Sequence, residues 1–263
     1  MRPDPVSRRL LRGAGRRPLI LMYHATPPTG RGTRWALPLR RFVEHLELLR
    51  AEGWRTMTVS ELLAQGMRGE RTVAITFDDG FADNMAAAEA LEARGMRATW
   101  FVVTARLGGE ARWSRGGEGR LMAAADVRRL HEAGHEIGSH TRTHAALDVL
   151  AGRALEEEVA GSRRELEDIL GAPVGAFAYP YGRVSEAAVR AVRAAGYRAA
   201  VTCRGGAVRP GADPLALPRL EVDGACGAGR LARMMALAAS PGSWMAVLSY
   251  LGRRVLHRLA VAA

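Results

Sequence analysis

Two neighbouring carboxylates are the first residues in this sequence whose types and spacing suggest chemistry. Asp78 and Asp79 precede Gly80 and directly follow the apolar run of residues 72–77. Adjacent carboxylates repel each other unless a cation or a shared proton relieves them, and glycine permits the sharp turn that would aim both in one direction. A solvated Asp-Gly turn explains the pair alone equally well, so its chemistry depends on a metal ion.

A pair of histidines could supply the other ligands of such an ion. His140 and His144 are four residues apart and follow the run of residues 135–139. One helical turn would therefore place both imidazoles on one face. Two histidines with one carboxylate suit a divalent metal and leave an open position for water. Histidines at this spacing also arise by chance, so the pair alone does not establish a metal site.

A third cluster closes another apolar run, residues 175–179. Pro180, Tyr181 and Gly182 combine a fixed φ with a tight turn, which could present a backbone N–H rigidly to a ligand. The aromatic rings could also form a wall for a sugar. Taken in isolation, a turn that ends a strand beside core aromatics is the favoured interpretation.

Short apolar runs alternate with amphipathic segments along the chain. Strands are expected over residues 19–23, 72–77, 97–103, 135–139, 175–179, 197–202 and 216–222. Helices are expected over residues 39–52, 84–94, 124–133, 151–170, 184–195 and 227–238. This alternation predicts an α/β fold with a parallel sheet, and about seven βα units favour an incomplete barrel over a doubly wound sheet. Because catalytic residues of such barrels follow the carboxyl ends of strands, the three clusters should converge, which favours a metal-dependent hydrolase.

Composition excludes several other classes of protein. The chain has 263 residues and a formal charge of +11. It contains 38 arginines and no lysine. Apolar residues make up 48% of it, which excludes global disorder. No run approaches the ~20 apolar residues of a membrane-spanning helix. Two cysteines cannot make a disulfide scaffold. The charge alone would suit a nucleic-acid binder, but stacking aromatics and a recognisable binding module are missing.

The three clusters, TFDDG, HTRTH and YPYG, resemble the motifs of the polysaccharide deacetylase family (NodB homology, carbohydrate esterase family 4). LILMYH, TWFVVT and LPRLEVDG resemble a branch of that family with an N-terminal MYH strand. The resemblance spans about residues 18 to 224. It implies a distorted (β/α)7-type barrel in a single domain, which agrees with the strand count above.

The resemblance also implies a role for each matching residue. Asp79, His140 and His144 would bind a divalent metal, most often zinc. Such an ion lowers the pKa of bound water toward ~7 and polarises the acetamide carbonyl. Asp78 would be the general base. Pro180 and Tyr181 would contact the substrate, and the backbone N–H of Tyr181 would join the oxyanion hole. The implied reaction removes N-acetyl groups from amino sugars in a polysaccharide, oligosaccharide or glycolipid.

The sequence departs from the family pattern at three motifs. The usual arginine before Pro180 is absent, an Asp/Trp-rich motif is not evident, and the late Leu-x-His motif has only a loose match at residues 255–257. His24, at the end of the run 19–23, is therefore the predicted general acid, with a capped or core histidine as the alternative. Arg219 could orient Asp78, although a surface ion pair is the preferred interpretation of that arginine.

Other residues leave alternatives open. Thr141 could hold the histidine loop in place, and Trp35 and Trp113 could be sugar subsites or ordinary packing. The alternative function is a carbohydrate-binding protein with a degenerate deacetylase site. It is disfavoured because binding alone needs no base beside three metal ligands.

The ends of the chain are expected to differ from its centre. A basic tail over residues 1–17 should be solvated, the deacetylase domain should span 18–240, and an Arg-rich amphipathic segment should follow over 241–263. These arginines hint at peripheral contact with a membrane or an anionic polymer. No signal peptide is visible, so a cytoplasmic or inner-membrane-face location is expected. No partner protein can be inferred.

Overall fold

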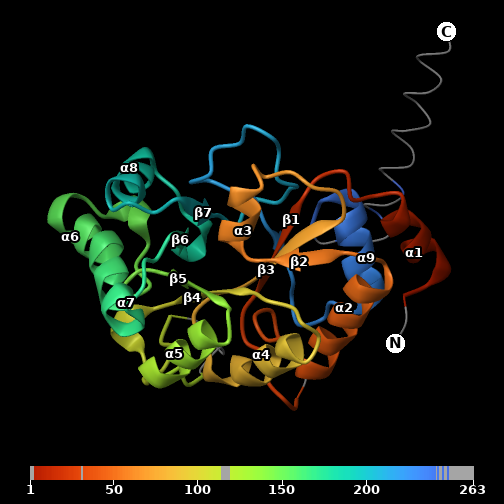
Figure 1. Ribbon diagram of the computed structural model, residues 1–263, viewed down its shortest axis with the longest axis horizontal. Coiled ribbons are helices and arrows are strands. Elements are labelled where there is room, and N and C mark those ends of the chain that lie inside the picture. Colours follow the sequence, from red (N-terminus) through yellow and green to blue (C-terminus); the bar gives the residue numbers. More distant parts are fainter. Residues whose placement is uncertain are drawn as a thin grey trace, which may run out of the picture.

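A curled sheet of parallel strands forms the centre of the molecule, and helices surround it (Figure 1). The computed structural model describes residues 3–30, 32–113 and 119–240, together with residues 242, 245 and 248. The strands are β1 (Leu19–Tyr23), β2 (Arg55–Met57), β3 (Thr72–Phe77), β4 (Thr99–Val102), β5 (Glu136–Ser139), β6 (Ala176–Ala178), β7 (Ala199–Val201) and β8 (Leu220–Glu221). Their order across the sheet is β7-β6-β5-β4-β3-β1-β8, with β2 also paired to β3.

After β1, helices alternate with the strands along most of the chain, as in a βα repeat. They are α1 (Pro5–Arg12), α2 (Leu39–Ala51), α3 (Val59–Ala64), α4 (Met85–Glu92), α5 (Ala124–Glu132), α6 (Gly152–Glu156), α7 (Ser162–Leu170), α8 (Glu186–Ala194) and α9 (Ala228–Leu237). Short 3-10 turns follow several strands, and one π-helical turn, η4 (Glu157–Gly161), joins α6 to α7. The predicted fold class, a distorted (β/α)7-type barrel, is confirmed.

The strands that were predicted are largely buried on both faces, which is why they read as continuous apolar runs. In β1 every residue is buried, with Leu19, Leu21 and Tyr23 in the core beneath the helices. Ile20, between them, packs with Ala74 and other residues on the opposite face of the sheet. Alternate residues of the strand thus point to opposite faces of the sheet, and the strand contributes to the core on each face.

All seven predicted strands are present, but the short elements β2 and α3 were not predicted, and neither was α1. Strand β2 has only three residues and begins exposed. Helix α3 has six residues and begins at a capping box in which Thr58 and Glu61 satisfy each other's backbone N–H groups. Elements this short carry too few residues for a period to show.

The expected solvated tail is wrong for residues 5–12. Helix α1 packs against α9, and its Leu11 is fully buried in the core. Arg8 and Arg12 donate to the two carboxylate oxygens of Glu52, at 2.7 and 2.9 Å. The buried Leu11 and the two ion pairs with Glu52 therefore hold the N-terminal helix against the barrel. The predicted segment 241–263 lies almost wholly outside the described residues.

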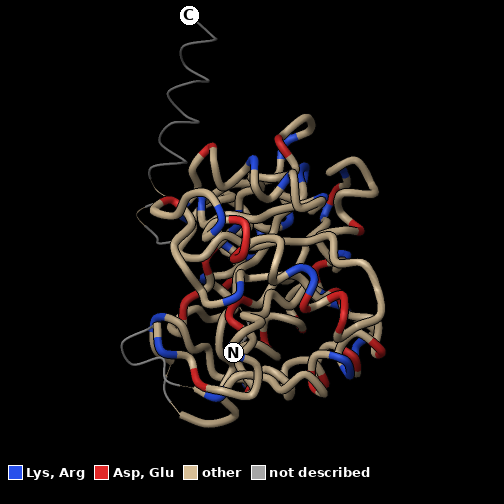
Figure 2. The backbone as a smooth tube through the Cα atoms, turned by 90° about the vertical axis from the view of Figure 1, so that its left-hand side faces the viewer, with Lys and Arg blue, Asp and Glu red and all other residues tan. Residues whose placement is uncertain are grey.

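Arginines and acidic residues are interleaved along the described chain (Figure 2). Many of them pair across elements, as Arg94 does with Glu47 and Arg129 with Glu92. Within the parts of the chain that the structure describes, no helix is long and apolar enough to cross a membrane.

Candidate active site

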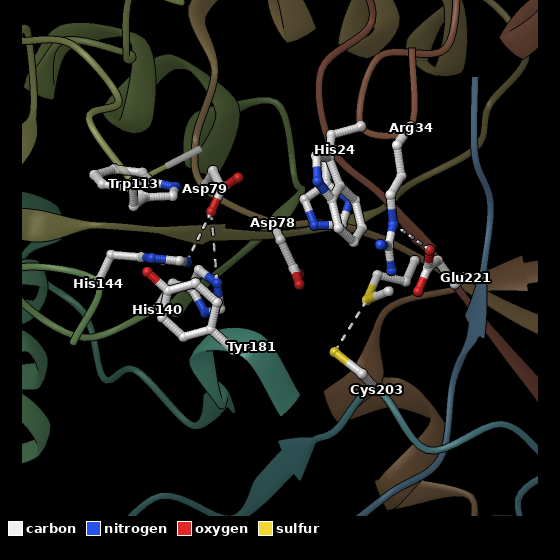
Figure 3. Close-up of a pocket in the computed structure, with 12 residues that line it drawn as sticks. His24, Arg34, Asp78, Asp79, Trp113, His140, His144, Tyr181, Cys203 and Glu221 are labelled. Carbon is white, nitrogen blue, oxygen red and sulfur yellow. Dashed lines mark hydrogen bonds and ion pairs between the residues drawn. The ribbon is translucent and has the colours of Figure 1, made fainter. Parts of the chain in front are cut away.

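The loops that follow β1, β3, β5 and β6 meet around one pocket of about 540 Å³ (Figure 3). Because these strands are parallel, their carboxyl ends lie at the same edge of the barrel. The pocket is lined by Met22, His24, Arg34, Trp35, Asp78, Asp79, Trp113, His140, His144, Tyr181, Cys203 and Glu221. Six of the seven site residues proposed from the sequence line it. Pro180, the seventh, is buried in the turn beside Tyr181.

Asp79, His140 and His144 form a buried cluster suited to a metal ion. Asp79 Oδ1 lies 3.2 Å from His144 Nε2 and 3.6 Å from His140 Nε2. One ligand atom from each residue lies within 4.8 Å of the others. Asp79 Oδ1 is buried and has no hydrogen-bond partner among the residues that the structure describes. A cation between these atoms would satisfy that oxygen, and one carboxylate with two imidazoles is a donor set that zinc accepts.

His140 is held in the form that a metal requires. Burial lowers its pKa to about 4, so its imidazole is neutral at pH 7. Its Nδ1 lies 2.8 Å from the carbonyl oxygen of Ala178. A carbonyl can only accept, so Nδ1 carries the proton and the lone pair of Nε2 faces Asp79.

His144 is fixed by aromatic neighbours. The Trp113 ring stacks on it at 4.5 Å between centroids, and Tyr181 meets it edge-on at 4.6 Å. In Figure 3 these three rings lie together at one end of the pocket. Trp113 and Trp35, which the sequence left undecided between subsite and packing, both line the pocket.

The histidines converge in a loop, so the helical turn expected from their spacing is wrong. Residues 140–144 are not helical, and Thr141 and His144 have left-handed φ values of 68° and 64°. Asp79 and Tyr181 share this conformation, with φ values of 73° and 60°. A side chain other than glycine pays about 1–3 kcal/mol there, a cost that clusters at functional sites. Thr141 Oγ1 accepts the N–H of His144 at 3.0 Å, as expected of a residue that holds this loop.

Gly80 and Gly182 permit the turns that the sequence required of them. Gly80 has a φ of +77°, and a Cβ there would lie 3.0 Å from a Val102 side-chain carbon. Gly182 has a φ of +65°, and a Cβ would meet that of Cys203 at 2.5 Å. Any other residue would clash or displace the neighbouring Asp79 or Tyr181.

Asp78 is paired with a buried arginine. Arg219 Nη1 and Nη2 donate to the two oxygens of Asp78 at 2.6 and 2.7 Å, and the residues are only 1% and 2% exposed. Arg219 also donates to Thr76 Oγ1 at 3.1 Å and to the carbonyl of Thr202 at 3.0 Å. Burial alone would raise the pKa of Asp78, but the Arg219 guanidinium outweighs it and holds that pKa well below its usual range. The surface ion pair preferred for Arg219 is therefore wrong.

His24 stands on the opposite side of Asp78 from the histidine pair (Figure 3). Its ring lies 4.6 Å from that of Trp35, and its Nδ1 is buried without a hydrogen-bond partner in the described part of the chain. The structure thus brings His24 into the pocket. The loosely matching residues 255–257 lie outside the described residues.

Four pocket residues were not singled out by sequence reasoning: Met22, Arg34, Cys203 and Glu221. The Arg34 guanidinium lies 4.4 Å above the Trp35 ring, and its Nε is 3.5 Å from Glu221. Cys203 Sγ lies 3.7 Å from the sulfur of Met22. Met22 belongs to the LILMYH segment and Glu221 to the LPRLEVDG segment, which were the only available signals. Arg34 and Cys203 belong to no motif.

The fold and the site together define a barrel hydrolase with a carboxylate–histidine cluster at the carboxyl ends of its strands. Residues 65–200, just over half of the chain, match the family model described as polysaccharide deacetylase. The chain belongs to the polysaccharide deacetylase family. The matched residues include Asp78, Asp79, both loop histidines and Tyr181, whereas His24 and Arg219 lie outside them.

Individual relatives support the same assignment. The chain is 29% identical over 208 residues to YxkH of Bacillus subtilis (strain 168), named as a polysaccharide deacetylase, with 77% of this chain and 70% of YxkH covered. It is similar in structure to BC0361, a polysaccharide deacetylase from Bacillus cereus, with a TM-score of 0.71, 25% identity and 83% and 68% of the two chains covered. IcaB from Ammonifex degensii gives a TM-score of 0.70 and 26% identity over 80% of this chain and 93% of IcaB.

Proposed function

We propose that this protein is a metal-dependent N-deacetylase that releases acetate from N-acetylated amino sugars in a polysaccharide, oligosaccharide or glycolipid. One observation carries the proposal. Three buried ligand atoms within 4.8 Å of one another stand beside a carboxylate that an arginine keeps ionised, in a pocket flanked by aromatic rings. Family membership supports deacetylation, and this arrangement supports the involvement of a metal.

Asp79, His140 and His144 would hold the divalent ion, for which zinc is the best match to one carboxylate and two imidazoles. When bound, such an ion activates water and polarises the acetamide carbonyl. The neutral state of His140 and the unsatisfied oxygen of Asp79 both fit this role.

The protein's own residues would move the protons. Asp78, ionised beside Arg219, accepts a proton from the water that attacks the acetamide carbon. The backbone N–H of Tyr181 donates to the oxyanion that forms, an interaction worth about 3 kcal/mol in comparable sites. His24 protonates the nitrogen as the C–N bond breaks. Collapse of the tetrahedral intermediate yields acetic acid and the amine, and acetic acid then loses its proton to solvent. The proton on Asp78 returns to His24 through solvent, so the net products are acetate, a free amine and one proton.

Aromatic side chains would hold the sugar on either side of this chemistry. Tyr181 is 52% exposed although it contacts His144. Trp113 and Trp35 also line the pocket, where Trp113 stacks on His144 and the Trp35 ring lies 4.6 Å from that of His24. Exposed aromatic rings at a pocket mouth offer the flat apolar faces that pyranose rings pack against. This supports an acetylated glycan as the substrate class.

The test is release of acetate from N-acetylglucosamine oligomers by the zinc-loaded protein, across a panel of acetylated glycans. We expect release that a chelator abolishes and that Asp79→Ala lacks. Arg129→Met, on an exposed ion pair, is the control that should retain activity. No release from any glycan while the ion is bound would refute the proposal and favour a carbohydrate-binding protein with a degenerate site.

A further inference from the structure

A single carboxylate anchors the loop that carries the two histidines. Glu158 Oε2 accepts the backbone N–H groups of Arg142 and Thr143, both at 3.0 Å. Its Oε1 accepts the hydroxyl of Thr143 at 2.7 Å. Glu158 therefore satisfies three donors from the two residues at the centre of the 140–144 loop.

Glu158 lies in the π-helical turn η4, in the middle of the helix that runs from α6 to α7. Single π turns of this kind occur frequently at functional sites. Ser162 ties the turn to the sheet, since its Oγ bonds the carbonyl of Glu158 at 2.8 Å and Ser139 Oγ at 2.7 Å. Ser139 ends β5, directly before His140. The anchor and the loop thus share one rigid support.

A second carboxylate of the same helix holds the outer side of the loop. Glu165 accepts Arg142 Nε at 2.7 Å and also the hydroxyl of Thr104. The backbone of the 104–105 turn donates to the carbonyls of Thr141 and Arg142, at 3.2 and 2.9 Å. Both edges of the loop are therefore bonded. Among the described residues, only Glu158 accepts the N–H groups of Arg142 and Thr143, which lie between the left-handed residues Thr141 and His144.

Those two residues are the reason an anchor is needed. Thr141 and His144 occupy a conformation that costs about 1–3 kcal/mol each for side chains of this kind. Without Glu158, the loop could lower its free energy by relaxing, and the N–H groups of Arg142 and Thr143 would turn to water. His144 would then leave its position 3.2 Å from Asp79.

We propose that Glu158 is a positioning residue that holds the 140–144 loop in its metal-binding conformation before the ion arrives. The inference rests on the proposed metal-dependent function. Without the Glu158 carboxylate, the 140–144 loop of the metal-free protein relaxes. Binding of the ion must then restore the loop conformation, so the affinity for the ion falls. Partners of metal ligands typically contribute about 10- to 100-fold to affinity, and we expect Glu158→Ala to weaken binding within that range.

The experiment measures dissociation constants of Zn²⁺ and Co²⁺ for the full chain, by competition with a chromophoric chelator. Glu158→Ala should bind about 10- to 100-fold more weakly than wild type. Glu158→Gln should lie between them, because its amide oxygen can still accept the two backbone N–H groups. Glu156→Ala is the matched control, since it removes an exposed carboxylate of the same helix and should bind as wild type does.

Thr143→Val gives a second, gentler variant if Glu158→Ala does not fold. It removes one of the three bonds from an exposed residue, and it should weaken ion binding about 2- to 10-fold. Wild-type affinity in Glu158→Ala, or equal losses in Glu158→Ala and Glu156→Ala, would overturn the inference. A wild-type protein that binds no ion would overturn it together with the metal site. Tight ion binding without acetate release would overturn only the proposed reaction, because the role of Glu158 is read from the dissociation constants.

Discussion

Replacement of Arg219 by methionine tests whether the buried ion pair sustains the site. The side chain keeps most of its volume, but Asp78 loses two charge-assisted hydrogen bonds of 2.6 and 2.7 Å. Both partners are almost fully buried, so water cannot replace the guanidinium. Removal of one partner from a buried pair typically costs about 3–5 kcal/mol. We expect the free energy of unfolding of Arg219→Met to fall by about that amount at pH 7.

The pH dependence of this loss has a definite sign. In the wild type the pKa of Asp78 lies below its unfolded value of 3.8, so the pair contributes stability above that pH and loses it as the pH falls. In Arg219→Met, burial becomes the dominant influence and raises the pKa of Asp78 instead. The variant is then least stable, relative to wild type, at neutral pH. The difference between the two proteins should shrink as the pH falls through the raised pKa.

Denaturant unfolding at pH 7 and pH 5 measures both effects. Arg129→Met is the matched control, because it breaks a bidentate pair with Glu92 that is half exposed, and it should cost less than about 1 kcal/mol. The double variant Asp78→Asn/Arg219→Met leaves no unpaired charge and should be more stable than Arg219→Met alone. An Arg219→Met protein within about 1 kcal/mol of wild type at pH 7 would refute the reasoning.

Two further predictions concern histidines. His24→Ala should lower kcat by about 100-fold or more, because a general acid contributes about 10²–10⁴-fold, while its dissociation constant for zinc stays that of wild type. Near-normal turnover with intact metal binding would reject His24 as the acid. His45 is fully buried between Tyr23 and the carbonyl of Cys226, and burial lowers its pKa from 6.5 to about 4. Below pH 6.5 the unfolded chain therefore binds more protons at His45 than the folded chain does. Lowering the pH from 7 to 5 should reduce the free energy of unfolding by about 2 kcal/mol through this residue. His45→Gln should show a shallower fall of unfolding free energy over that range, and an unchanged slope would contradict the assignment.

The strands and the cluster of Asp79, His140 and His144 could be predicted because their signals are local. Strands β1 and β3 match their predicted ranges to the residue, since both faces are buried and every position is apolar or small. Asp79, His140 and His144 stand out because few other arrangements need those residue types directly after a strand. The short elements β2 and α3 have no such period and were not predicted.

Conformation within the loops could not be predicted from spacing. The interval of four residues between His140 and His144 indicated a helical turn, but the loop brings the imidazoles together through left-handed residues. That backbone is stabilised by Glu158, which belongs to no recognised motif, and by Thr104, which ends the TWFVVT segment. A conformation held by contacts from other elements leaves no trace in the five residues of the loop itself.

The sequence by itself determined the fold class, the family and the chemical types gathered at the site, because periodicity and motif residues are properties of short segments. Only the tertiary structure decided which distant residues complete the site. Arg219 reaches Asp78 across 141 positions because β8 lies beside β1 and β1 beside β3. This order of strands is the reason that Arg219 is buried beside Asp78 and does not form an ion pair at the surface. The same holds for the N-terminal helix, whose basic residues face Glu52 only once α2 and α9 have packed.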